Sequence, residues 1–322
     1  MCKNTIFLNW LLFYEPNFPQ NMDTIILLFL CLLLGIVFQN VNSFPKNAHL
    51  ALNQFVLNVS IPAMALYYIP KIKIDESLLF PVGIAWIGFL ISFLFFYALG
   101  KIFKWSNKLT GCLIIVAGLG NTSFVGFPVL EAMYGKEAIE TAIIVDQPGS
   151  FVVLSTLGVL VAMLYSKEQP SISIIAKKIF FFPPFIMFVM AVILNIFEVD
   201  FPESLQSVFQ RLAATVSPIA LVAVGLQLKI EKRSKHWKFL SLGLIFKLII
   251  TPLFFYLFYK VILGANGLII NVSIMESAMA PMITGAILAS TYGLKPKLSS
   301  MMVGIGIPLS FITLVLWYFI LK

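Results

Sequence analysis

One block of this sequence occurs twice, about half a chain length apart. Residues 59–66 (VSIPAMAL) return as 216–221 (VSPIAL), Tyr134-Gly135 returns as Tyr292-Gly293, and Pro148 is echoed by Pro308. Three matches in the same order at nearly one separation indicate an internal repeat of about half of the 322 residues. In an apolar chain, a half-length repeat with interrupted helices is typical of secondary transporters, which bind their substrate where the repeats meet.

The composition places the chain in lipid. It is 60% hydrophobic and 11% charged, with a mean hydropathy of +0.98, whereas soluble domains have about 25% charged residues. We therefore expect the lipid bilayer as its surroundings. The net charge of +8 then reflects basic loops on the cytoplasmic side. No nucleic-acid partner is expected, because nearly all basic residues are Lys, whereas phosphate recognition favours Arg.

The apolar segments divide the chain into ten predicted membrane spans, each close to the roughly 20 residues that a bilayer requires. They are 23–40, 49–69, 79–100, 109–133, 137–165, 173–197, 204–228, 237–261, 266–291 and 297–320. Ten spans give two five-helix repeats, 22–166 and 167–322. Because five is odd, the second repeat enters the membrane from the opposite side, so the repeat is inverted. The expected fold class is an all-α membrane protein.

The distribution of charge predicts the orientation. Lys and Arg are about twice as frequent in the odd-numbered connections as in the even-numbered connections and termini together, so the odd connections are expected in the cytoplasm. Both termini then lie outside the cytoplasm, in a multi-pass protein of the cell (inner) membrane. Residues 1–21 are too short in apolar length to span, and we expect them to be a dispensable extension.

Two spans carry signs of interruption near their middle. The fourth contains Gly118-Leu119-Gly120-Asn121-Thr122-Ser123 and then Gly126-Phe127-Pro128, and the ninth contains a polar start at Glu276, Pro281 and Gly285. Interrupted helices are tolerated in a membrane only inside protein or beside a wet cavity. Such breaks expose helix N-termini, which favour anions, and Asn121, Thr122 and Ser123 add donors. The alternative is a pair of proline kinks that only shape packing.

Ionisable residues within the spans are candidates for ion coupling. They are Asp146 and its neighbour Gln147 in the fifth span, Lys247 in the eighth and Glu276 in the ninth. Charge inside a bilayer is costly, so such residues are usually paired or functional. A structural ion pair is the alternative for Lys247, which could also extend toward the inner interface.

These residues resemble a known family. Asn121-Thr122-x-x-x-Gly126-x-Pro128 with Tyr134-Gly135 is similar to the fourth-helix signature of the auxin efflux carriers. Met279-Ala280-Pro281, Tyr292-Gly293, Pro308 and residues 57–63 resemble further stretches of that family. The similarity runs from Met22 over nearly the whole chain. A short connection after Lys167, in place of a long cytoplasmic loop, is similar to the bacterial permeases of the family.

The resemblance implies a fold similar to the bile-acid/sodium symporters. Helices 1, 2, 6 and 7 would form a scaffold, and helices 3–5 and 8–10 a mobile core in which helices 4 and 9 cross. An elevator-type displacement of the core would give alternating access. The resemblance also implies that Asn121, Pro128 and Pro281 line the substrate site. It does not cover Asp146 and Glu276, so the coupling ion stays open between H⁺, Na⁺ and none.

The resulting hypothesis is a secondary active transporter, a permease or efflux carrier, for a small organic anion, with a carboxylate favoured. An ion channel and a non-transporting membrane sensor are the alternatives. An intramembrane enzyme using Asp146 and Glu276 as a carboxylate pair is a further one, but no nucleophile or metal motif accompanies them. No catalytic residue, metal site or cofactor is predicted. Substrate identity and direction stay open, as does the oligomeric state, with a homodimer as one alternative.

Overall fold

The computed structural model describes residues 22–45, 47–73, 75–166, 181–228 and 236–322. The predictions for residues 1–21, and several of the basic residues used for orientation, lie outside the described residues. The described chain is helical throughout, apart from one isolated β-bridge between Gly120 and Pro281.

The first half forms helices over the predicted spans one to five. Their bounds are α2 (Met22–Phe38), α3 (Ala48–Phe55), α4 (Ile61–Tyr68), α5 (Leu79–Ile102), α6 (Asn107–Gly118), α7 (Phe127–Tyr134), α8 (Glu137–Ile144) and α9 (Val159–Ser166). Turns of π-helix join several of them, namely η1 (Val56–Ser60), η4 (Thr122–Gly126), η5 (Val145–Phe151) and η6 (Leu154–Gly158). Pro62 and Pro128 each follow a π-helical turn, η1 or η4, within a continuous helical run, and such a turn accommodates the missing N–H of a proline.

The described part of the second half is also helical. Its helices are α11 (Pro183–Ile196), α12 (Glu203–Ala213), α13 (Val216–Gln227), α14 (Trp237–Ile245), α15 (Thr251–Phe255), α16 (Leu268–Ser277), α17 (Ile283–Thr291) and α18 (Pro296–Leu321), with π-helical turns η7 (Phe246–Ile250) and η8 (Tyr256–Ile262). Each predicted span overlaps one of these helices or a continuous run of them. For the sixth predicted span, residues 173–180 lie outside the described residues, and the described helix α11 begins at Pro183.

Among the described residues, six helical runs are long and apolar enough to cross a membrane: 48–71, 76–102, 137–166, 203–227, 237–262 and 296–321. Four apolar helices are shorter: 26–38, 107–118, 183–196 and 268–277. The fold is therefore that of an all-helical membrane protein, as expected. Two of the short helices, α6 and α16, end where the sequence predicted interruptions. The ten-span count and the inverted repeat stay predictions.

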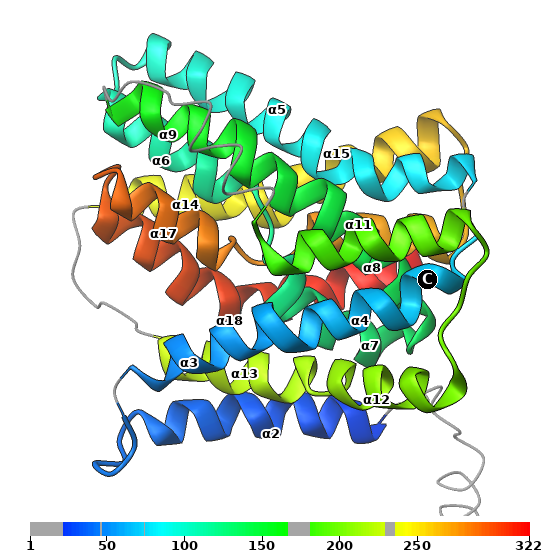
Figure 1. The fold of residues 1–322 in the computed structure, drawn as a ribbon. Helices are drawn as coiled ribbons and strands as arrows, with labels where there is room; N and C mark the ends of the chain where they lie inside the picture. The colour runs from blue at the N-terminus through cyan, green and yellow to red at the C-terminus, as the bar shows by residue number, and fades with distance from the viewer. Residues whose placement is uncertain (1–21, 46, 74, 167–180, 229–235) are drawn as a thin grey trace, which may run out of the picture.

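One group of helices contains α2, α3, α4, α11, α12 and α13. Figure 1 shows α2 and α13 side by side at one edge of the molecule, and α4 packs on α11 and α12. The α2–α13 contact depends on glycine. A Cβ at Gly225 would lie 2.4 Å from the carbonyl oxygen of Leu32 and 2.8 Å from the Cα of Gly35. Small residues allow such close approach of membrane helices.

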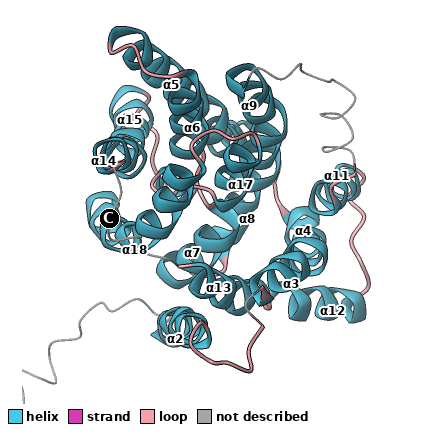
Figure 2. Ribbon diagram, turned by 90° about the vertical axis from the view of Figure 1, so that its left-hand side faces the viewer, coloured by secondary structure: helices cyan, strands magenta, loops and turns pink. Residues whose placement is uncertain are grey.

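The other group contains α5, α6, α9, α14, α16, α17 and α18. The helix α6 packs on α5, α9 and α17, while α18 packs on α14 and α17. Figure 2 shows α5, α6, α9 and α14 on the side away from α2, with α7 and α8 between the two groups. The interrupted helices α6 and α16 therefore end inside the molecule, where their free backbone groups meet protein rather than lipid.

Candidate functional site

The two interrupted segments pair with each other. The N–H of Asn121 donates to the carbonyl oxygen of Ala280 at 2.8 Å, and the N–H of Met282 donates to that of Leu119 at 3.1 Å. Between these bonds Gly120 lies opposite Pro281, a position in the ladder that needs no N–H from the proline. The pairing satisfies backbone groups that an interrupted helix would otherwise leave unpaired in the membrane.

Gly120 is required by the crowding at this pairing. A Cβ there would lie 3.2 Å from the carbonyl oxygen of Glu276 and 3.2 Å from the Nζ of Lys247. These contacts explain why a residue without a side chain lies here. Beyond the paired segment, η4 and α7 continue from Asn121, and α17 begins at Ile283. Their N-terminal ends, which carry positive partial charge, therefore start beside the crossing.

Asn121 caps the helix that follows the break. Its Oδ1 accepts a hydrogen bond from the N–H of Phe124 at 3.2 Å, as the N-cap residue of η4. Its Nδ2 is buried and has no hydrogen-bond partner within the described residues. Buried side-chain donors are nearly always paired, so this one is available for a ligand.

Asp146, in the π-helical turn η5, contacts the first residues of that same helix. Its Oδ1 accepts from the hydroxyl groups of Thr122 and Ser123, each at 2.5 Å, and its Oδ2 accepts from the Nε2 of Gln147 at 2.5 Å. Asp146 is 2% exposed. The structure thus brings together four of the predicted site residues around one carboxylate. The Oε1 of Gln147 has no partner within the described part of the chain.

Glu276 and Lys247 lie beside Gly120 of the paired segment. Both are buried, at 0% and 3% exposure. The carboxyl group of Glu276 packs against η4, because a Cβ at Gly126 would lie 2.7 Å from its Oε1 and 2.8 Å from its Oε2. Lys247 lies in the π-helical turn η7. Because it is buried, its side chain does not extend to the surface of the protein.

The two predicted prolines occupy different positions. Pro281 is in the paired segment itself, opposite Gly120. Pro128 is in the first turn of α7, several residues after the break at residues 119–121. The expectation that Pro128 interrupts the fourth span is therefore corrected: the helical run that starts at Thr122 continues through Pro128, and the π-helical turn η4 directly before it accommodates the missing N–H.

A small cavity lies beside Asn121 and Asp146. Its volume is about 60 Å³, and its polar lining comes from Asn121, Ser123, Asp146, Gln147 and Thr284. The rest of the lining is mainly apolar, namely Leu57, Ile61, Phe124, Phe151, Leu154, Phe182 and Met282. This volume holds only a few water molecules, since one takes about 30 Å³ of liquid. Sequence reasoning missed Thr284, which no motif marked.

Larger cavities extend from this one. A cavity of about 290 Å³ shares Phe151, Leu154, Phe182 and Thr284 with it. A third, of about 440 Å³, shares Ile287 and Thr291 with the second. Shared lining residues show that the three cavities are neighbours in a series, from the crossing to the turn that ends α17.

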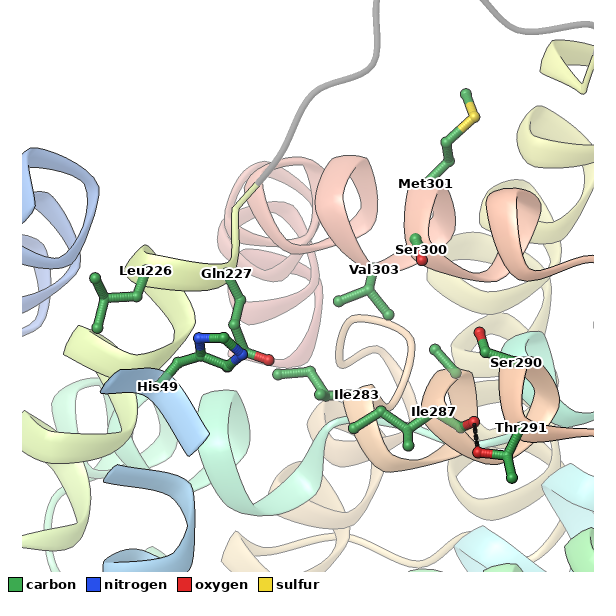
Figure 3. Close-up of a pocket in the computed structure, with 11 residues that line it drawn as sticks. His49, Leu226, Gln227, Ile283, Ile287, Ser290, Thr291, Ser300, Met301 and Val303 are labelled. Atoms are coloured by element: carbon green, nitrogen blue, oxygen red, sulfur yellow. Dashed lines mark hydrogen bonds between the residues drawn. The ribbon is translucent and has the colours of Figure 1, made fainter. Parts of the chain in front are cut away.

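The third cavity lies between the two groups of helices. Figure 3 shows His49 and Gln227 on one side, with Ser290 and Thr291 on the other. Its side-chain polar groups are neutral hydroxyls, an amide and an imidazole, and no carboxylate is among its described lining. Sequence reasoning did not assign His49 to a site, because a lone histidine near a loop carries no spacing signal.

At the start of α13, the first group of helices is hydrogen-bonded to α7. The hydroxyl of Ser217 in α13 donates to the Oε2 of Glu131 in α7 at 2.9 Å. This contact and the third cavity lie at opposite ends of the interface between α13 and the helices of the crossing. A hydrogen bond thus closes this interface at the Ser217 end of α13, and the third cavity opens it at the Gln227 end.

The apolar helices and the polar crossing define an integral membrane protein of the transporter class. A profile of the family described as "Membrane transport protein" matches residues 21–318. The chain therefore belongs to this family, that of the auxin efflux carriers, which confirms the resemblance seen in the motifs.

Curated relatives agree with this assignment. An uncharacterized transporter of Methanocaldococcus jannaschii is 30% identical over 311 residues, covering 93% of this chain and 98% of the relative. One of Methanothermobacter thermautotrophicus is 27% identical over 310 residues, covering 94% and 99%. The uncharacterized transporter YfdV of Escherichia coli is 22% identical over 303 residues, covering 90% and 94%. The alignments span nearly the full length of each relative, so the whole chain is similar to transporters.

Proposed function

We propose that the protein is a secondary active transporter for a small organic anion, with a carboxylate favoured. The observation that carries this proposal is that Asn121, a residue lining the cavity beside the paired break, has a buried Nδ2 with no hydrogen-bond partner among the described residues. The N-terminal ends of η4 and α17 begin at the same place, where their positive partial charge favours an anion. Thr284 adds a hydroxyl group from the second interrupted helix.

Asp146 explains how the transport of an anion would be coupled. A carboxylate lining the cavity repels an anionic substrate, and in a medium of low dielectric constant this repulsion is strong. A cation bound at Asp146 removes the repulsion, so cation and anion bind best together. The hydroxyl groups and the free Oε1 of Gln147 supply oxygen ligands that suit Na⁺, and the carboxylate alone suits H⁺. We propose coupling to one of these two ions.

The proposed architecture is the 5+5 inverted repeat with crossing helices, as in bile-acid/sodium symporters. In this reading α2, α3, α4, α11, α12 and α13 belong to the scaffold, and the remaining helices to the mobile core. The connected cavities would form the route to one side, which the charge bias assigns to the cytoplasm. The Ser217–Glu131 contact would close the other side, and displacement of the core would exchange the two. Both termini then lie outside the cytoplasm.

Uptake into proteoliposomes tests the proposal. The panel holds malate, malonate, other short carboxylates and indole-acetate, each with and without a pH or Na⁺ gradient. Saturable uptake of one anion, driven by one gradient and lost in Asn121→Ala, is the expected result. If well-folded protein takes up none of these anions, the helix-end argument for an anionic substrate is wrong.

A further inference from the structure

Lys247 is a buried cation that the proposed transport cycle does not use. It does not line the three connected cavities, as far as the described residues define them. A buried charge is unfavourable unless opposite charge or oriented dipoles surround it. The position of its ammonium group therefore needs a physical account.

The Nζ of Lys247 lies where the two interrupted helices end. It approaches Gly120 at the same point as the carbonyl oxygen of Glu276, since a Cβ on Gly120 would lie 3.2 Å from both. The helix α6 ends at Gly118, and α16 ends at Ser277. The last carbonyl groups of a helix lack partners within it, and each C-terminal end carries about half a negative charge. Two such ends together match about one monovalent cation.

The other half of the chain treats its helix end differently. Ser92 in α5 donates its hydroxyl to the carbonyl oxygen of Ile114, near the end of α6, at 3.0 Å. Ser92 and Lys247 are separated by nearly the spacing of the sequence repeat. The neutral hydroxyl of Ser92 thus bonds within α6, while the charged ammonium group of Lys247 lies where α6 and α16 end. The charge on Lys247 is therefore more than a means of satisfying one carbonyl group.

Glu276 supplies a second observation. It is fully buried, and neither carboxyl oxygen has a hydrogen-bond partner among the described residues. Buried carboxyl groups are normally hydrogen-bonded or paired with a cation. The backbone carbonyl of the same residue and the Lys247 ammonium group both lie beside Gly120, so Lys247 carries a fixed cation close to this residue.

We propose that the Lys247 ammonium group is a resident cation that holds the ends of α6 and α16 together at the crossing. It takes the place that a bound monovalent cation would otherwise have to fill. Only the cavity beside Asp146 then takes an exchangeable cation. Lys247 is a positioning residue, because it acts through the geometry of the paired segments at Gly120 and Pro281. This inference deepens the proposed function and rests on it for its consequence, but its test reads cation binding directly.

The test is thermal unfolding of purified full-length protein in detergent. Lys247→Ala removes the ammonium group and leaves a space, whereas Lys247→Met fills the space without charge. Each is melted in sodium, potassium or methylammonium chloride and in choline chloride at matched ionic strength. We expect a saturable rise of about 4 °C in the Tm of Lys247→Ala with at least one small cation over choline. The wild type, Lys247→Met and the exposed-lysine control Lys238→Ala keep only the Asp146 site, so they should not respond to potassium or methylammonium, and any rise in sodium should be smaller than that of Lys247→Ala.

No response of Lys247→Ala to any of the three cations would overturn the proposal, as would an equal response of the wild type. A second pair of variants decides the matter if Lys247→Ala cannot be purified. Lys247→Gln keeps length and polarity without charge, and should melt lower than wild type, while Lys247→Arg should stay close to it. A Lys247→Gln protein as stable as wild type would also overturn the proposal.

The two proposals fail in different ways. Absence of anion uptake by the wild type would refute the carrier function, and would leave the melting data to decide the role of Lys247. A wild type that transports, with a Lys247→Ala protein that ignores cations, would refute only the resident cation.

Discussion

The substitution Asp146→Asn separates the coupling role of this residue from its structural one. The Asn side chain keeps one oxygen to accept from Thr122 and Ser123, as Oδ1 of Asp146 does at 2.5 Å. Its amide can donate to the Oε1 of Gln147, which is unpaired, once the Gln147 amide turns over. Since no hydrogen bond need be lost and a buried charge is removed, the Tm should not fall.

Coupling, in contrast, should disappear. One carboxylate lines the cavity within the described residues, so we expect one cation to accompany each anion. For a monocarboxylate, a tenfold cation gradient is worth about 1.4 kcal/mol and drives about tenfold accumulation. Asp146→Asn should bring the ratio of inside to outside substrate at steady state to about one, while equilibrating exchange of labelled substrate continues.

The assay is steady-state accumulation in proteoliposomes with an imposed H⁺ or Na⁺ gradient. The matched control is Asp200→Asn, the same chemical change at an exposed residue whose carboxylate accepts from the N–H of Phe201 and from the Nε2 of Gln206 in α12. Unchanged accumulation by folded Asp146→Asn would show that Asp146 is structural and that the coupling ion binds elsewhere.

Three further substitutions test the site and its support. Asn121→Ala should raise KM about tenfold or more, since hydrogen bonds to charged groups contribute about 1.5–3 kcal/mol. Asn121→Ser keeps the helix cap and should restore stability but not substrate affinity. An unchanged KM in both variants would contradict the site. Gly126→Ala should reduce transport severely, because its Cβ would lie 2.7 Å from a Glu276 oxygen; Gly88→Ala, whose nearest neighbour would be 3.5 Å away, is the control that should transport normally. Gly225→Ala should lose about 1–3 kcal/mol of stability through overpacking against α2, and a melting temperature equal to wild type would disprove that close contact.

The helices could be predicted from the sequence because lipid imposes their length and apolarity. Apolar runs near 20 residues predicted where helices lie, and Gly120 and Pro281 marked the two breaks. The pairing of these two residues could not be predicted, because it depends on long-range packing that no local pattern records. Pro128 shows the opposite error: its residue type suggested a break, yet the helical run from η4 into α7 continues through it.

For the site residues as well, the sequence predicted one part of the arrangement and could not predict the other. Cost arguments selected Asp146, Glu276 and Lys247 as buried charges, and the structure buries all three. Their different surroundings were beyond the sequence, since spacing does not tell which helix end a side chain will face. Thr284 lay outside every motif, and only the cavity shows that it belongs with Asn121.

The interrupted helices place opposite partial charges on the two sides of one backbone pairing. On the side where η4 and α17 begin, the positive ends lie beside the Asp146 carboxylate and the free donor of Asn121. On the side where α6 and α16 end, the negative ends lie beside Lys247. A fixed cation on the second side leaves the cavity on the first side as the place where charge changes during transport. A carrier built in this way can bind an anion and a cation together in apolar surroundings, because each fixed charge at the crossing already faces a helix end of opposite sign.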